Sequence, residues 1–314
     1  MASKLQTISA NQFITDYAQG KAQTSMQPVA DFIAPTVAVP FSTGRFKVYS
    51  ERYRFKIAKT ERGPGGRAVE IGMDQTDGAF NCEAHAIDVP VDVLELDAGA
   101  NALVTMQDAA DLAAAQGALS HEKKVISMAV ANATNTAVTW TSGSTDIVAQ
   151  IDAKVLAVIK TAAAGSGAGV GIVFGPTAWM TFRNNATVRG RFVVGSGNTR
   201  IGGQPVQIVD ENAATGLFIG NPMVKVAYIA EDTAADGQTP SMSFLMDDKV
   251  LIFARTDNPT RRDPSFMKTF RLSGKFMVPG SYSRDDGRVE VAKFDWSEDV
   301  KVTNAPAGAM LTVS

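Results

Sequence analysis

The stretch from Arg45 to Val93 constrains the fold most, because its residue pattern predicts a long two-stranded arm with opposite charges on its two limbs. Eight lysines and arginines lie between Arg45 and Arg67, against two acidic residues. From Ala68 to Asp111 there are ten acidic residues and no lysine or arginine. An isolated two-stranded hairpin is marginally stable in water and needs a surface to pack on. We expect that surface to belong to another copy of the chain.

Both limbs of this arm show the alternation of a strand with one exposed face. The first limb, residues 46–59, alternates aromatic with basic side chains, and the return limb, residues 87–93, alternates aliphatic residues with aspartate. Because most charges point away from the aromatic residues, one buried and one charged face are favoured over a surface that stacks single-stranded nucleic acid. Pro90 confines the return limb to a sheet edge or a bulge.

The charged residues of the two limbs are candidate subunit contacts, because a basic limb that meets an acidic surface on a neighbour would fix the register between subunits. These residues are Arg52, Arg54, Lys56, Lys59, Asp88 and Asp92. A second candidate contact is a charged loop that two prolines make rigid, and its members are Arg261, Arg262 and Asp263.

Three helices are predicted in the middle of the chain. The first runs from Asn101 to Ala133, where alanine is dense and apolar residues recur at spacings of three and four. Its alanine face is shallow, so another element can approach the helix backbone closely. A second helix is expected from about Thr145 to Ala164, followed by a strand at 170–174. Pro176 then opens a third helix, since a proline in the first turn loses no hydrogen bond.

The chain after Gly190 is predicted to be mostly strands. Two long strands, Met267–Val278 and Arg288–Trp296, are expected to pair across a turn at Arg284–Gly287. The shorter candidate strands are Pro205–Val209, Gly216–Ile219, Val224–Ile229, Ser241–Met246 and Lys249–Ala254, with a hairpin turn at Asp247–Asp248 between the last two. Three other segments have weaker patterns. Residues 1–44 are expected to form an extended arm or a disordered tail, with a short helix at 11–18. Residues 132–144 are expected to form a polar loop, and residues 303–314 show no clear element.

The composition is that of an ordinary soluble globular protein, with 45% apolar and 20% charged residues. The net charge of −2 gives no overall basic signature of a nucleic-acid-binding protein. A single cysteine and two histidines argue against a disulfide within the chain and against a metal site built from these residue types. The sequence starts without a signal-peptide pattern, and no apolar run approaches the ~20 residues of a membrane span.

The sequence does not match the catalytic and cofactor-binding motifs that its glycine-rich run and its polar residues suggest. The glycine-rich run at 165–171 follows a helix and precedes a strand, whereas a dinucleotide-binding loop follows a strand and opens a helix. No nucleophile elbow of the form G-x-S-x-G is present. Cys82 is expected to be a half-buried structural thiol, and His121, within a run of charged residues, is expected on a solvated helix face. We therefore predict no catalytic, cofactor-binding or metal-binding residue and no enzyme activity.

Several local strings, taken in their order, resemble one known family. They are DIVAQIDAKVLAVIK followed by VGIVFGPTAWMTFR, then RIGGQPVQIVDE followed by LFIGNPMVKVAYI, and then LIFARTDNPTRRDPSFMKTFRL. Their order and spacing resemble the major capsid protein of tailed bacteriophages, with the Hong Kong 97 type of α+β capsid fold. The resemblance implies an N-terminal arm at 1–45, an extended hairpin or E-loop at 46–93, a peripheral domain with the spine helix at 94–145, a mixed α/β axial domain at 146–254, and peripheral-domain return strands with the C-terminal tail at 255–314.

The resemblance also implies a function. Proteins of this family assemble as pentamers and hexamers into an icosahedral shell around packaged double-stranded DNA. The implied partners are other copies of the chain, a portal, a separate scaffolding protein, decoration proteins, and DNA through non-specific contacts. A separate scaffolding protein is expected because only about 45 residues precede the arm. The implied location is the virion, with assembly in the host cytoplasm. Two alternatives remain open: an encapsulin-like compartment that loads a cargo enzyme, and, less favoured, a nucleotide-using enzyme built on residues 165–182.

Overall fold

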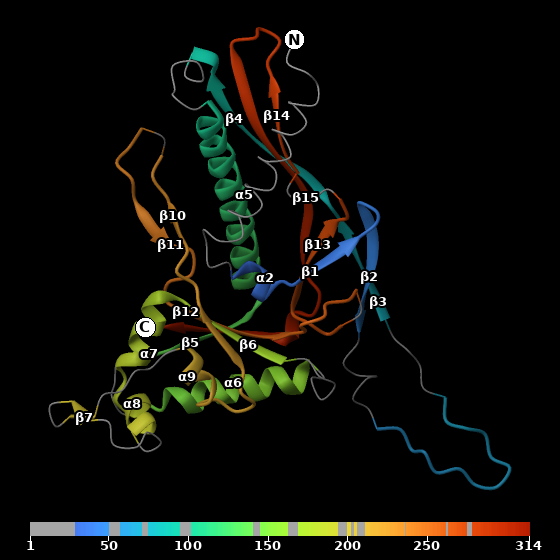
Figure 1. Cartoon of the computed structure of the whole chain (residues 1–314). Coiled ribbons are helices and arrows are strands. Elements are labelled where there is room, and N and C mark those ends of the chain that lie inside the picture. Colours follow the sequence, from blue (N-terminus) through green and yellow to red (C-terminus); the bar gives the residue numbers. More distant parts are fainter. Residues whose placement is uncertain are drawn as a thin grey trace.

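Two sheets, with a long helix that contacts both, form the body of the molecule (Figure 1). The structure is a computed structural model of the whole chain. The residues that it describes are 29–49, 57–70, 75–94, 102–140, 145–162, 169–193, 200–201, 204–205, 211–235, 237–261, 263–274 and 278–314.

The first sheet has five strands and carries the long helix on one face. Strand β15 (Val289–Val302) pairs on one side with β13 (Met267–Leu272) and β14 (Val278–Ser283), and on the other side with β4 (Glu83–Asp92). The remaining strand, β1 (Thr36–Val39), pairs in parallel with β13. Because β4 pairs only with β15 among the described strands, Pro90 lies on a sheet edge, as predicted.

Helix α5 (Ala102–Asn132) packs on this sheet through its small residues. Ala109, Ala110, Ala113 and Ala114 are buried in one cluster with Phe294 and Trp296 of β15. A Cβ atom added at Gly117 would lie only 2.8 Å from the ring of Phe294, so helix and sheet are in close contact there. The predicted long helix and its shallow face are both confirmed.

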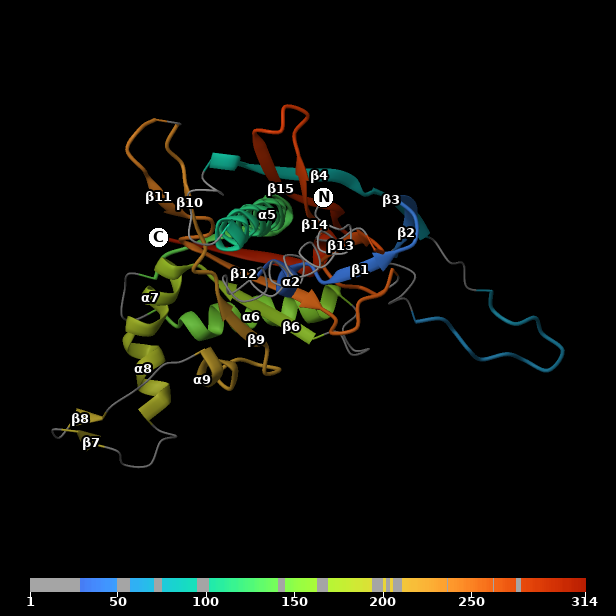
Figure 2. The ribbon, with the colours of Figure 1, turned by 45° about the horizontal axis from the view of Figure 1, so that its top comes forward.

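The second sheet has the strand order β5-β16-β12-β6-β9 and holds the largest core. Its strands are β5 (Thr134–Val138), β16 (Gly308–Val313), β12 (Lys249–Arg255), β6 (Gly169–Phe174) and β9 (Met223–Val226). Helix α6 (Ile147–Thr161) buries its apolar stripe against this sheet, while the end of α5 lies on the opposite side (Figure 2). Three shorter helices flank it: α7 (Pro176–Asn184), which begins at the expected proline, α8 (Ala186–Val193) and α9 (Glu211–Thr215).

Three two-stranded elements extend from this body. Strand β2 (Thr43–Tyr49) pairs with β3 (Gln75–Asn81), β10 (Ala230–Asp232) pairs with β11 (Met242–Phe244), and β7 (Arg200–Ile201) pairs with β8 (Gln204–Pro205). The base of the first hairpin is held by aromatic packing, because Phe46 and Phe80 stack on Phe270 of β13 with ring centroids 5.5 Å and 4.4 Å apart.

The pairing of the early hairpin corrects one prediction. The return limb is β3, whereas residues 87–92 belong to β4 and pair with β15 of the first sheet. Alternation marks which face of a strand is buried but does not identify its neighbour, and the sequence pattern fits both arrangements. The part of the first limb from 50 to 56 lies outside the described residues.

The segment before the hairpin also differs from the expected extended arm. A short helix, α2 (Ala30–Ile33), and strand β1 are packed into the body, with Phe32, Ile33 and Val39 buried. The helix predicted at 11–18 lies outside the described residues.

Other strand predictions need correction as well. Residues 134–138 and 308–313 form strands of the second sheet, although both segments were expected to lack one. Residues 216–219 form turns after α9, and strand β11 pairs with β10 instead of turning at Asp247–Asp248 to meet β12. The turn at Arg284–Gly287 between β14 and β15 is confirmed, with Gly287 at φ 65°. The strand expected at 267–278 ends at Leu272, and β15 extends to Val302.

Candidate assembly surfaces

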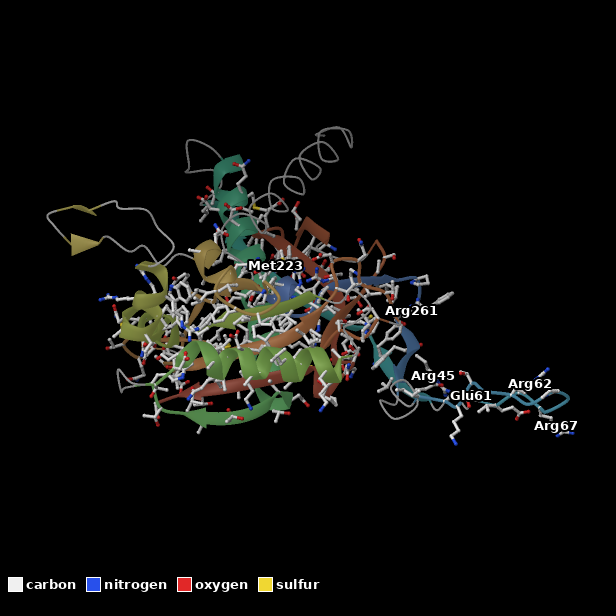
Figure 3. The ribbon with its side chains drawn as sticks, turned by 90° about the horizontal axis from the view of Figure 1, so that it is seen from below. Arg45, Glu61, Arg62, Arg67, Met223 and Arg261 are labelled. Carbon is white, nitrogen blue, oxygen red and sulfur yellow. The ribbon has the colours of Figure 1, made fainter. Side chains whose placement is uncertain are left out.

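The most exposed described segment is residues 57–70, which we call the projecting loop. It continues the β2–β3 hairpin away from the body, and Figure 3 shows Arg62 and Arg67 at its far end. Ile57 has 96% of its surface exposed. A surface that covers this aliphatic side chain would remove apolar area from water, which is favourable.

The charge of the projecting loop is mainly basic. Lys59, Arg62 and Arg67 are all exposed, with Glu61 and Glu70 between or beside them. At the root of the hairpin Arg45 of β2 lies 3.6 Å from Asp77 of β3, which links the two strands. Of the candidate contacts predicted on the basic limb, Lys59 lies in this loop, whereas Arg52, Arg54 and Lys56 lie outside the described residues.

The two predicted acidic contacts lie on β4, at the exposed edge of the first sheet. The carboxylate of Asp88 accepts a hydrogen bond of 3.0 Å from the hydroxyl of Tyr282 on β14, and this bond raises the pKa of Tyr282. Asp92 accepts a bond of 2.8 Å from the backbone N–H of Leu94. Both carboxylates are exposed and belong to the sheet rather than to the arm, so an acidic edge and a basic loop are separate surfaces of one subunit.

Asp263 lies beside a buried lysine of its own subunit, and its role as a subunit contact stays a prediction. Its side chain is only 9% exposed and lies 3.1 Å from the ammonium group of Lys268, which is itself buried. It also accepts hydrogen bonds from the hydroxyl and backbone N–H groups of Ser265. Burial raises the pKa of Asp263, but the bonds from Ser265 and Lys268 outweigh burial and leave this pKa lowered.

Of the three contacts predicted in this loop, Arg261 is the described residue whose side chain is available to a partner. It is exposed, and its guanidinium lies 5.8 Å from the centroid of the Phe80 ring at the base of the hairpin. The neighbouring Arg262 lies outside the described residues.

A buried polar cluster that the sequence did not indicate joins α5 to the first sheet. The imidazole Nδ1 of His121 lies 2.8 Å from a carboxylate oxygen of Glu298 on β15, and Nε2 lies 3.2 Å from a terminal nitrogen of Arg271 on β13. Since a guanidinium can only donate, Nε2 accepts and the ring proton is on Nδ1, facing Glu298. His121 is therefore not on a solvated face.

The charge of Glu298 is stabilised within this cluster. Burial acts to raise its pKa, but the hydrogen bond from His121 and the guanidinium of Arg271 outweigh burial and lower the pKa to about 2. Arg271 lies 3.3 Å from Glu298 and 3.6 Å from Asp31 of α2. The cluster thus connects α5, two strands of the first sheet and the segment that precedes the hairpin.

Cys82 is buried, and its thiol donates to the backbone carbonyl of Phe270 at 3.4 Å. Burial raises the pKa of this thiol, which disfavours the thiolate needed for reactivity.

Within the described part of the chain no group of histidine, cysteine, aspartate and glutamate side chains could hold a metal ion. None of the described helices is long and apolar enough to cross a membrane.

The two-sheet architecture, the long helix and the projecting hairpin can be compared with solved structures. A phage-related protein from Bordetella bronchiseptica superposes with a TM-score of 0.68 over 96% of both chains, at 13% identity. The mature capsid protein of bacteriophage PhiM1 gives a TM-score of 0.57 at 9% identity, over 89% of this chain and 84% of that one. This chain has the Hong Kong 97 type of capsid fold.

A similar fold also occurs in a structure that is not a phage capsid. An encapsulin complex from Synechococcus elongatus superposes with a TM-score of 0.54 at 12% identity, over 92% of this chain and 88% of that one. No protein-family model matches the sequence, and no curated protein matches it either. The predicted α+β capsid architecture is therefore confirmed at the level of the fold.

Proposed function

We propose that this chain is the structural subunit of a phage shell, which self-assembles as hexamers and pentamers around double-stranded DNA. The capsid fold supports this proposal, and the observation that carries it is the projecting loop. Its apolar residues Ile57 and Val69 and its basic residues are exposed on an arm that the subunit itself does not cover. A loop of this kind gains stability when it lies on a neighbouring subunit.

We propose that the E-loop comprises β2, the projecting loop and β3, residues 43–81, instead of the range 46–93. The stacked rings of Phe46, Phe80 and Phe270 fix the hairpin base to the first sheet, so the loop is carried by a rigid support. Its lysine and arginine residues complement acidic surfaces such as the β4 edge with Asp88 and Asp92. Complementary charges of this kind set the register and rate of association more than its final strength.

Helix α5 would act as the rigid spine of the subunit. Its alanine face and Gly117 pack closely on β15, and the His121–Glu298–Arg271 cluster adds polar contacts near the middle of the helix.

The proposed assembly has further partners, which are a separate scaffolding protein, a portal and decoration proteins. The shell contacts DNA non-specifically. It forms in the host cytoplasm and then becomes part of the virion.

Electron microscopy of the expressed protein, with and without a co-expressed scaffolding protein, tests the proposal. We expect capsomers or closed shells for the natural chain. Replacement of residues 57–70 by a glycine–serine linker of equal length should abolish shells, while circular dichroism and thermal melting confirm that the subunit still folds. Monomers under every condition would refute the proposed function, and intact shells from the linker variant would refute the role of the loop.

A protein compartment of the encapsulin type is the second candidate, because an encapsulin complex shares the fold over most of its length. The contents of purified particles distinguish the two candidates. Nuclease-protected DNA supports the phage shell, whereas a co-purifying protein cargo without nucleic acid supports the compartment.

A further inference from the structure

Residues 29–39, which we call the strap, contact both sheets of the body. The strap comprises α2 and β1, and in Figure 1 it runs from the lower end of α5 to β13. Helix α5 also contacts both sheets, because its first half packs on the first sheet and its second half on the second. The strap is therefore a second connection between the sheets, and the way in which it is held affects the angle between them.

The β1 end of the strap is held on the first sheet by main-chain hydrogen bonds. Strand β1 pairs in parallel with β13 over its whole length. The backbone N–H of Thr269 donates to the carbonyl of Pro35 at 3.2 Å, and the N–H of Ser273 donates to the carbonyl of Val39 at 2.9 Å. Release of this end would break these bonds together.

The backbone of α2 is fixed on α5 and on β13. At the start of the helix, the backbone nitrogen of Ala30 contacts the carboxylate of Glu122 on α5. At its end, the carbonyl of Ala34 accepts a bond of 3.1 Å from the hydroxyl of Thr269. These contacts do not involve the second sheet, so they can persist when the strap leaves that sheet.

An aromatic side chain holds the strap on the second sheet. Phe32 is only 5% exposed and meets Phe253 of β12 edge to face, with ring centroids 5.5 Å apart and an interplanar angle of 82°. A glycine of β6 leaves room for this slot, because a Cβ atom added at Gly171 would lie 3.0 Å from the ring of Phe32 and 2.8 Å from that of Phe253. An alanine at position 171 would crowd the slot.

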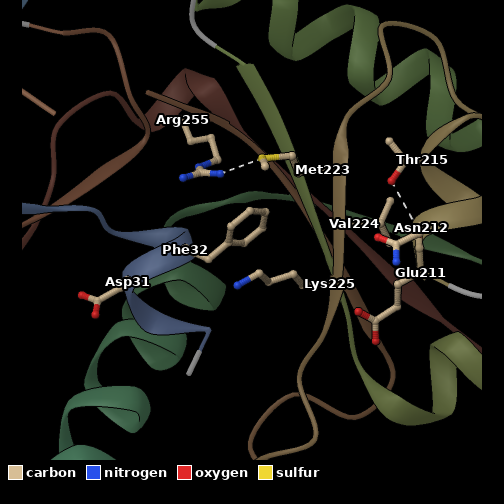
Figure 4. Close-up of a pocket in the computed structure, with 9 residues that line it drawn as sticks. All are labelled: Asp31, Phe32, Glu211, Asn212, Thr215, Met223, Val224, Lys225 and Arg255. Atoms are coloured by element: carbon tan, nitrogen blue, oxygen red, sulfur yellow. Dashed lines mark hydrogen bonds between the residues drawn. The ribbon is translucent and has the colours of Figure 1, made fainter. Parts of the chain in front are cut away.

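The ring of Phe32 lies between two cations (Figure 4). The guanidinium carbon of Arg255 lies 4.6 Å from the ring centroid, and the ammonium nitrogen of Lys225 lies 4.9 Å from it. Cation–π attraction of this kind stabilises the ring in its slot. Arg255 is itself 3.1 Å from Asp257. All these contacts are made by side chains, in contrast to the main-chain bonds of β1.

An open cavity of about 670 Å³ borders Phe32. Its far side is formed by Met223 and Val224 of β9 and by α9 (Figure 4). Because the slot is open toward this cavity, the ring can leave it in that direction. The two ends of the strap therefore differ: one is paired strand to strand, and the other is an aromatic side chain beside open space.

We propose that the strap sets the angle between the two sheets and that Phe32 is its releasable end. With Phe32 in its slot, α2 links β12 to α5 and, through β1, to the first sheet, so the two sheets keep one angle. When the ring leaves, the second sheet can tilt about α5. This property belongs to the single subunit and does not depend on the proposed assembly, in which two angles would let one sequence occupy both hexamers and pentamers.

Distance measurements between the two sheets test the proposal on unassembled subunits. Spin labels are placed by Lys160→Cys on α6 and Asp285→Cys in the β14–β15 turn, both exposed positions, in a chain that also carries Cys82→Ser. With Phe32 present we expect one main distance by double electron–electron resonance, and an open state below about a tenth of the molecules.

Phe32→Ala should raise the ratio of open to closed subunits at least about a hundredfold, because the packing of the ring is lost in the closed state alone. A second distance should therefore become prominent. Phe41→Ala is the control, since Phe41 lies just after the strap and is 73% exposed, and it should leave the main distance unchanged. An unchanged single distance in folded Phe32→Ala would rule out control of the angle by the strap.

Two further variants decide the question if Phe32→Ala does not fold. Phe32→Leu keeps an apolar side chain and should shift the ratio in the same direction by a smaller factor. Gly171→Ala crowds the slot in a chain whose strap is unaltered, and it should populate the same second distance. Circular dichroism shows which variants are folded, and a single natural distance in both of these would overturn the proposal.

Hydrogen exchange shows which end of the strap is released. In Phe32→Ala the backbone N–H groups of Thr269 and Ser273, which donate to the strap, should exchange at the rate of the natural chain. Faster exchange at both positions would mean that the whole strap detaches, and would refute Phe32 as the releasable end. Because these measurements use single subunits, a failure of the chain to form shells leaves their outcome unaffected.

Discussion

The backbone nitrogen of Ala30 lies 3.0 Å from each carboxylate oxygen of Glu122, so a side chain of α5 caps the first turn of α2. Glu122 is only 1% exposed, and burial raises its pKa although the backbone bond opposes this change. The first turn of a helix has N–H groups without partners inside the helix, and a carboxylate satisfies them well. This contact fixes the segment before the hairpin onto the spine helix.

We expect Glu122→Ala to destabilise the subunit by about 2 to 3 kcal/mol, because it leaves buried N–H groups without an acceptor. Urea unfolding measures the free energy, and hydrogen exchange should speed up at residues 29–34 in particular. Asp108→Ala is the control, since Asp108 is exposed on the same helix. Equal effects of the two substitutions would contradict the capping role.

The low pKa of Glu298 predicts an acid dependence of stability. Its folded-state pKa of about 2 lies below the ordinary value of 4.5, so its contribution is present above pH 4.5 and is lost as the pH falls toward 2. The full effect of such a difference is about 3 kcal/mol. Glu298→Gln should lower stability at pH 7 and flatten the loss between pH 4.5 and 2, as followed by urea unfolding at several pH values. An unchanged slope in the variant would show that other carboxylates cause the acid sensitivity.

Gly117 and Gly190 should respond in opposite directions to alanine. At Gly117 the new Cβ would lie 2.8 Å from the buried ring of Phe294, whereas at Gly190 of α8 nothing lies within 4 Å. We expect Gly117→Ala to cost about 1 to 3 kcal/mol through overpacking. Gly190→Ala should stabilise the chain by up to about 1 kcal/mol through helix propensity. Thermal unfolding of both variants gives the comparison, and a stabilising Gly117→Ala would argue against close packing of α5 on β15.

Asp263→Asn should act on folding rather than on subunit contacts. The substitution leaves the buried Lys268 without its countercharge, and breaking a buried pair in this way costs about 3 to 5 kcal/mol. The matched control is Asp285→Asn in the exposed β14–β15 turn, which should change stability little. If Asp263→Asn unfolds like the natural chain but assembles poorly, the predicted role of Asp263 as a contact residue would be supported.

The elements that the sequence predicted well are those with strong local signals. The alanine density of 102–132, the apolar stripe of 147–161 and the proline at 176 each specify a helix without help from distant residues. The turn at Arg284–Gly287 needs a residue with positive φ, and Gly287 supplies it. The order of these local elements was sufficient to indicate the capsid fold.

The predictions that failed depended on long-range pairing. The alternation at 87–92 does belong to a strand, but the strand it pairs with, β15, lies about 200 residues later in the sequence. The pattern of one strand does not indicate which other strand will pair with it. The ion pair of Asp263 with Lys268 shows the same limit, because nothing in the local sequence indicated it. His121 and Glu122 lie in a charged run that is typical of a solvated helix face, and nothing local indicates that Glu122 is buried and that His121 is only 11% exposed.

The pairing of β16 with β12 and β5 has a consequence for synthesis. Strand β5 leaves the ribosome about 175 residues before the strand that joins it to the second sheet. At ribosomal rates this interval lasts on the order of 10 to 30 s. In the last part of this interval, after β12 has been made, the β12 edge that β16 will cover has no partner, and the largest core is open. In the proposed assembly, a nascent subunit therefore lacks a complete second sheet until β16 has emerged from the ribosome.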